Sequence, residues 1–167
     1  NWITYIFMRY ILLLVLFFTN KNITALELSC LFEEVHQNGD TEQGVFITKD
    51  EKFRYQYFSQ NLITIIYQDG LFIYLQNSDT TKYFAIDKNT SALEAISKIV
   101  NDFPDIKNDY FLNDISIKVE ISKASKFSKR LIVLSENFNM SIYINDCKNI
   151  DIDDKYFLFS PFWDYKY

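Results

Sequence analysis

The fold of this chain is decided by residues 53–76, which read FRYQYFSQNLITIIYQDGLFIYLQ. The segment begins with aromatic side chains that alternate with polar ones, and this places three rings on one face of a strand: Phe53, Tyr55 and Tyr57. Two apolar runs then flank Asp69-Gly70, a dipeptide typical of a two-residue β-hairpin turn. The pattern predicts consecutive antiparallel strands.

The same strand pattern continues on both sides of this segment. We expect strands over residues 30–36, 45–48, 53–57, 62–68, 71–76, 81–86, 115–121, 131–135, 140–145 and 156–159. Between them, Ser91–Val100 carries apolar residues at helical spacing, with Thr90 or Ser91 as N-cap and Pro104 beyond its end. The sequence therefore predicts a mainly β (α+β) domain, a curved antiparallel sheet with at least one helix against it.

The amino-terminal part of the chain has the layout of a secretory signal. Residues 11–18 form an unbroken apolar run behind Arg9. We expect a cleaved signal peptide over 1–25, with Met8 as the true start, and one domain over 26–167. The alternative is a retained anchor, in which Arg9 would lie within the membrane span at a cost of about 2.5–3.5 kcal/mol.

Composition argues against several function classes. The chain has 167 residues, a net charge of −5, three glycines and a single histidine, His36. The basic residues are scattered along an acidic chain and form no patch in the sequence, so we expect no nucleic-acid partner. No glycine-rich phosphate loop or paired-histidine site occurs, and we expect no enzymatic activity, no cofactor and no metal site. The carboxylates near the carboxyl end would suit a hard cation, but they also suit a solvated acidic hairpin: Asp146, Asp151, Asp153 and Asp154.

The two cysteines of the chain, Cys30 and Cys147, lie far apart in the sequence. An exported protein can join such a pair in one disulfide, and the alternative is two free thiols.

Four segments of the domain resemble, in order, the motifs of a known family. Gly44–Tyr57 resembles G-x-(aliphatic)-x-x-K-R-P-x-K-F-R-(aromatic)-x-Y, and Ile66–Tyr74 resembles I-x-S-D-G-K-x-(apolar)-W. Asn89–Leu93 and Asp154–Pro161 resemble N-T-P-(apolar)-(apolar) and D-x-x-F-x-F-x-P. Leu71, Tyr74 and Ser91 stand where these motifs have Lys, Trp and Pro. The ordered set resembles the periplasmic outer-membrane lipoprotein carriers (LolA type). The chain departs from that family in having Lys49-Asp50 in place of Arg-Pro, and in having almost no amphipathic helix before the first strand.

The resemblance implies an unclosed barrel with a helical lid, whose apolar cavity binds the acyl anchor of lipoproteins in the periplasm. Such a carrier moves lipoproteins from an inner-membrane lipoprotein-releasing transporter to an outer-membrane acceptor. Lys49 would then occupy the position of the family's cargo-retaining Arg. We expect a monomer whose cavity is lined by Phe53, Tyr55, Tyr57, Ile65, Tyr74, Leu93 and Ile96.

A second interpretation stays open at this point. Alternating aromatic residues usually indicate a closed core. The chain would then be an exported structural or interaction domain that keeps the fold without transporting lipid.

Overall fold

The computed structural model describes residues 26–86, 92–112, 114–136 and 139–158, and the predicted signal peptide lies outside these ranges. The elements are β1 (Glu27–His36), β2 (Thr41–Lys49), β3 (Lys52–Tyr57), β4 (Ile63–Gln68), β5 (Leu71–Gln76), β6 (Asp79–Ile86), α2 (Ala92–Asn101), β7 (Asp109–Leu112), β8 (Ile115–Ile121), β9 (Ser128–Leu134), β10 (Asn139–Lys148) and the 3-10 helix η1 (Asp154–Phe157). No helix in these ranges is long and apolar enough to cross a membrane.

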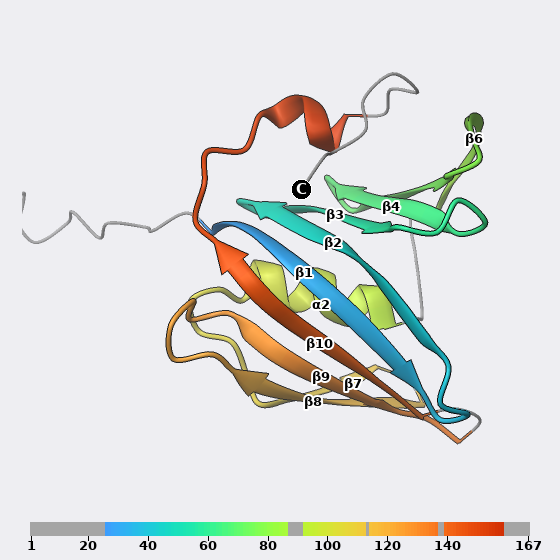
Figure 1. Ribbon diagram of the computed structural model, residues 1–167. Helices are drawn as coiled ribbons and strands as arrows, with labels where there is room; N and C mark the ends of the chain where they lie inside the picture. The colour runs from blue at the N-terminus through green and yellow to red at the C-terminus, as the bar shows by residue number, and fades with distance from the viewer. Residues whose placement is uncertain (1–25, 87–91, 113, 137–138, 159–167) are drawn as a thin grey trace, which may run out of the picture.

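All ten strands form one antiparallel sheet, in the order β6-β5-β4-β3-β2-β1-β10-β9-β8-β7. The chain runs outward from β1 to β6, crosses through α2, and returns from β7 to β10, which pairs with β1 (Figure 1). The sheet is not closed, because its edge strands β6 and β7 pair with only one neighbour each. The predicted mainly β, unclosed antiparallel sheet is therefore confirmed.

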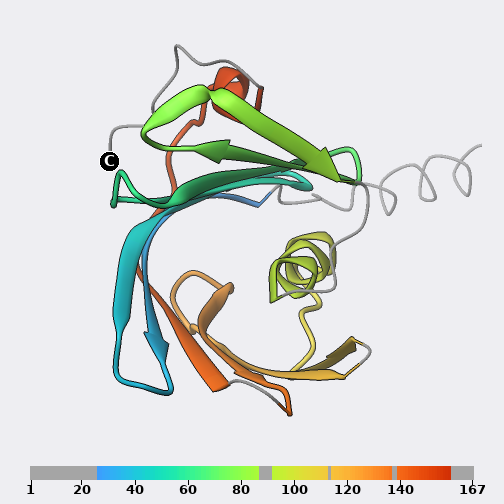
Figure 2. The ribbon, with the colours of Figure 1, turned by 90° about the vertical axis from the view of Figure 1, so that its right-hand side faces the viewer.

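The sheet curls strongly, and α2 lies on its concave side (Figure 2). Two hydrophobic cores result, one on each side of the sheet. The inner core lies between the sheet and α2, and it includes Phe32, Phe46, Phe53, Tyr55, Ile96 and Phe127. The outer core lies on the convex side under the C-terminal segment, and it consists of Val45, Ile47, Ile66, Leu75, Ile152 and Phe157.

The predicted hairpin turn is present, because Asp69 and Gly70 both adopt positive φ, 52° and 80°, as that turn requires.

Two elements differ from the prediction. The strand β7 was not predicted, because its four residues are too few to show a period. The prediction of a strand over 156–159 is wrong, since the Asp153 side chain accepts a hydrogen bond from the Lys155 amide and starts η1 instead.

Candidate functional site

The structure brings all seven predicted cavity residues together on the inner side of the sheet. Strand register accounts for this, because Tyr55 of β3 pairs with Ile65 of β4, which in turn pairs with Tyr74 of β5. Two of them, Tyr57 and Leu93, are half-buried and pack against the inner core. The other five are buried within this core: Phe53, Tyr55, Ile65, Tyr74 and Ile96. The five residues from strands form one surface, the aromatic wall, and the other two, Leu93 and Ile96, belong to α2, which covers this wall.

Aromatic residues that were not predicted complete this wall. The Phe32 ring stacks on Tyr55 with centroids 3.8 Å apart, and the Phe46 ring stacks on Phe127 at 5.6 Å. The alternation in β1 places Phe32 and Glu34 on one face of that strand. The pairing of β1 with β2 brings that face onto the wall, and alternation alone does not show which face of β1 is the inner one.

The helix α2 covers the wall with one apolar face. Its buried side chains are Ala92, Ala95, Ile96, Ser97, Ile99 and Val100. All of them except Ser97 belong to the inner core, and the helix contacts β3 and β8, which lie on opposite arms of the curled sheet (Figure 2). A single helix of ten residues therefore bridges the concave side.

A buried carboxylate lies within the aromatic wall. Oε1 of Glu34 accepts hydrogen bonds from the hydroxyls of Tyr55, at 2.7 Å, and Tyr57, at 2.8 Å. Nε2 of His36 lies 3.6 Å from Oε2 of the same carboxylate. Burial, followed by the negative charge of Glu34, raises the pKa of both tyrosines above the ordinary value of 10.0. Both hydroxyls therefore stay protonated and donate to the carboxylate.

Lys49 lies away from the aromatic wall, at the end of β2. Its Nζ donates to the backbone oxygen of Ile152 at 2.7 Å and lies 3.7 Å from carboxylate oxygens of Glu27 and Asp154. Burial would lower the pKa of Lys49, but the charges of Asp154 and Glu27 raise it overall. The structure thus places the residue matched to the family's cargo-retaining Arg against the C-terminal segment.

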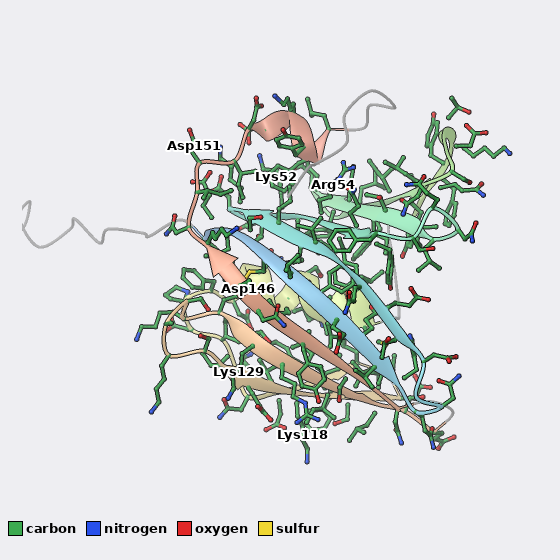
Figure 3. The ribbon with its side chains drawn as sticks, viewed as in Figure 1. Lys52, Arg54, Lys118, Lys129, Asp146 and Asp151 are labelled. Carbon is green, nitrogen blue, oxygen red and sulfur yellow. A yellow bond between two sulfur atoms is a disulfide. The ribbon has the colours of Figure 1, made fainter. Side chains whose placement is uncertain are left out.

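Asp154 and Glu27 hold this C-terminal segment on the outer side. Asp154 accepts a hydrogen bond from Lys52 at 2.9 Å, and the Ile152 amide donates to Glu27 at 2.6 Å. Figure 3 shows Asp151 on the segment that leads into η1 and Lys52 beneath that segment. In the ranges that the structure covers, no three His, Cys, Asp or Glu side chains are grouped to hold a metal ion.

Arg54 lies on the same outer side, but the C-terminal segment covers it. Arg54 is only 3% exposed. Its Nε donates a hydrogen bond to Oε1 of Gln56, and its Nη1 donates to the backbone oxygen of Tyr156. The alternation of β3 places Arg54 on the face opposite the rings, and the structure agrees. It carries no information about the segment that covers this outer face, which returns from 102 residues further along the chain.

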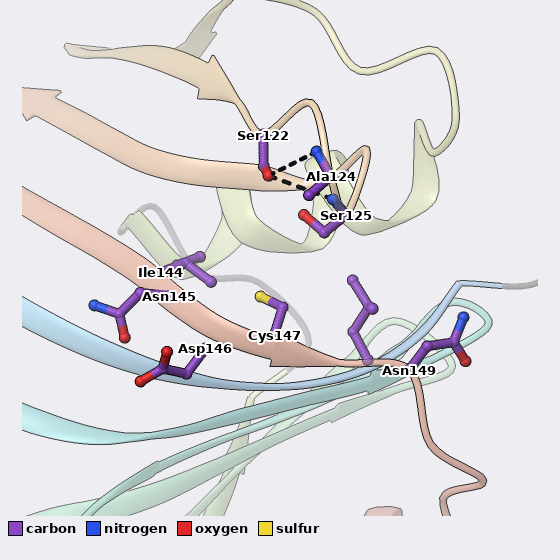
Figure 4. Close-up of a pocket in the computed structure, with 9 residues that line it drawn as sticks. Ser122, Ala124, Ser125, Ile144, Asn145, Asp146, Cys147 and Asn149 are labelled. Carbon is purple, nitrogen blue, oxygen red and sulfur yellow. Dashed lines mark hydrogen bonds between the residues drawn. The ribbon is translucent and has the colours of Figure 1, made fainter.

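A pocket of about 400 Å³ opens at one end of the inner core. Leu28, Ile144 and Cys147 contribute its apolar part, while Ser122, Ser125 and Asn149 contribute polar atoms. Figure 4 shows Ile144 and Cys147 on the side of β10 that faces the turn, where the Ser122 hydroxyl accepts from two backbone amides. The volume falls within the range of small-molecule sites, roughly 300–1,000 Å³.

A disulfide joins Cys30 of β1 to Cys147 of β10, with Cα atoms 4.0 Å apart. It ties together two neighbouring strands near the middle of the sheet, beside this pocket.

A scan against protein-family models and a search of curated proteins found no match to this chain. The geometry alone therefore defines the site, a concave aromatic wall with one buried carboxylate and one covering helix.

Proposed function

We propose that this protein is an exported carrier that binds acyl chains between the aromatic wall and α2. In this proposal it takes the acyl anchor of lipoproteins across the periplasm, from an inner-membrane releasing transporter to an outer-membrane acceptor. The sequence resemblance to lipoprotein carriers supports the identity of the cargo. The curled, unclosed sheet with its aromatic concave side is the observation that carries the proposal.

Acyl chains need such an apolar surface to travel through water. Each exposed methylene costs about 0.8 kcal/mol, so a long chain cannot cross an aqueous compartment uncovered. Rings such as Phe46, Phe53 and Tyr55 offer a broad apolar surface without specific polar demands. In this proposal α2 acts as a lid that moves aside for the chains, and the packing of its buried face against the aromatic wall supports that role.

The burial of the wall also favours one alternative. Phe53 and Tyr55 have no exposed surface, which is what an ordinary closed core shows. The alternative is an exported structural or interaction domain that has the same sheet and binds no lipid.

Native mass spectrometry of the purified protein, followed by titration of the delipidated protein with a fluorescent acyl probe, separates the two functions. A carrier is expected to co-purify with lipid. After delipidation it is expected to bind the probe saturably, with a fixed molar ratio of probe to protein. A protein that carries no lipid and leaves the probe unbound, while remaining folded, is the structural domain.

A further inference from the structure

Glu34 is unusual among the charged residues of this protein. Among the residues that the structure describes, Glu34 and Arg54 are the only charged ones that are fully buried. Arg54 lies on the outer side of the sheet, under η1. The inner side therefore buries one negative charge and no positive charge.

Glu34 lies where the aromatic wall meets solvent. Along the inner face of β1, the buried Cys30 and Phe32 are followed by Glu34, which is 5% exposed, and then by His36, which is half-exposed. Tyr57, one of the two hydroxyl donors, is also half-buried. A chain lying along the wall can thus bring its polar end to this carboxylate.

The carboxylate of Glu34 acts as a hydrogen-bond acceptor. A single oxygen, Oε1, accepts two hydroxyl hydrogen bonds. The charged or titratable groups around it are His36 of β1, the two tyrosines of β3, and Glu42 of β2, whose charge acts on Tyr57. No Lys or Arg is among these groups.

We infer that Glu34 selects the polar end of the acyl ligand, so that the site accepts chains ending in a neutral or cationic group and rejects free fatty acids. This inference rests on the proposed acyl-binding function. Two carboxylates close together in a poorly solvated place repel strongly, and one of them must take up a proton. An amide N–H or an ammonium group can instead donate to the carboxylate of Glu34.

Three ligands of equal chain length test the selection on the unmodified protein: dodecanoate, dodecanamide and dodecylamine. The affinity of each ligand is measured by competition against a fluorescent acyl probe at neutral pH. The amide and the amine are expected to bind at least about tenfold more tightly than the acid, which corresponds to about 1.4 kcal/mol. Equal affinity for acid and amide overturns the inference and leaves the proposed function intact. Failure of all three ligands and of the probe overturns both.

A pair of neighbouring variants assigns the effect to the buried carboxylate. Glu34→Gln keeps the shape and an acceptor oxygen, and it is expected to raise dodecanoate affinity until acid and amide differ by about twofold or less. Glu33→Gln is the matched control, because Glu33 is a half-buried neighbour on the other face of β1 whose carboxylate accepts from Gln43. An unchanged preference for the amide in Glu34→Gln, or an equal loss of preference in both variants, contradicts the role of Glu34.

Discussion

The packing of the aromatic wall leaves no room for a Cβ atom at Gly44. In the pairing of β1 with β2, Gly44 lies opposite Phe32. A Cβ atom added at Gly44 would overlap both the Phe32 ring and the backbone oxygen of Gln56. The backbone oxygen cannot move without distorting the β2–β3 pairing, so only glycine fits between these groups.

We therefore expect Gly44→Ala to lower the free energy of unfolding by about 1–3 kcal/mol through overpacking. Chemical denaturation measures this loss. Gly70 provides the contrast, because a Cβ there meets no atom within 4 Å and only the positive φ of 80° matters. Gly70→Asn should be tolerated, since Asn adopts this conformation readily. A Gly44→Ala protein as stable as the wild type would show that the wall is loosely packed.

The covering helix α2 is the element on which the proposed function depends. Ile96 of α2 and Ile66 of β4 are both fully buried, but Ile96 belongs to the inner core and Ile66 to the outer core. Truncation of either to Ala should destabilise the protein by about 2–5 kcal/mol. Only Ile96→Ala also weakens the closed position of α2, and a larger open fraction raises the apparent affinity for an acyl probe in proportion.

The expected result is tighter probe binding in Ile96→Ala than in Ile66→Ala, with similar losses of thermal stability. Thermal unfolding and probe titration of the two variants measure both quantities. Identical probe binding in the two variants would show that α2 is part of a fixed core and does not open.

The C-terminal segment should dock in a pH-dependent way. The hydrogen bond from Lys52, and then its charge, lowers the pKa of Asp154 below the ordinary value of 3.8. A lowered pKa means that the folded state favours the ionised carboxylate, so the stabilisation is present above the ordinary pKa and is lost as the pH falls through the lowered one. The protection of residues 151–158 against hydrogen exchange, relative to an unstructured peptide at the same pH, should therefore fall in acid before that of the central strands.

Lys52→Met is the informative variant for this segment. It removes the hydrogen-bond donor of Asp154, so faster exchange of residues 151–158 is expected already at neutral pH. Lys129→Met is a suitable control, because Lys129 points away from the sheet near Glu120, far from η1 in Figure 3. Equal exchange in the two variants would mean that the outer core alone holds the segment.

Local patterns in the sequence were sufficient for most elements of this protein. The alternation of residues 53–57 and the Asp69-Gly70 dipeptide correctly predicted β3, β4 and β5. The pairing of β1 with β10 could not be predicted, because contact between strands so far apart in the sequence leaves no periodic trace. Alternation shows which side chains share a face of a strand but not which face lies on the concave side, so Phe32, Phe46 and Glu34 were not assigned to the wall. Alternation also carries no information about the C-terminal segment that covers Arg54.

At the scale of the whole molecule, the disulfide is the strongest single constraint. Cys30 and Cys147 are 117 residues apart in the sequence, and closing so long a loop removes much of the freedom of the unfolded chain. Replacing both cysteines by serine should lower the free energy of unfolding by about 2–5 kcal/mol. Denaturation of this variant beside the oxidised protein measures the loss, and reduction of the wild type should give a similar value. No loss in either case would show that the thiols are not paired in solution.

The placement of β1 and β10 at the middle of the sheet has a consequence for biosynthesis. Ribosomes make β1 first among the strands and β10 last, so a nascent chain cannot join the two halves of the sheet until residue 148 has emerged. Contacts between such distant segments also make folding slow. Until then β1 remains an edge strand with an apolar inner face, and Cys30 remains a thiol without its partner. A chain truncated before Asn139 therefore exposes a template for pairing with other chains, and self-association of the nascent protein is the expected outcome.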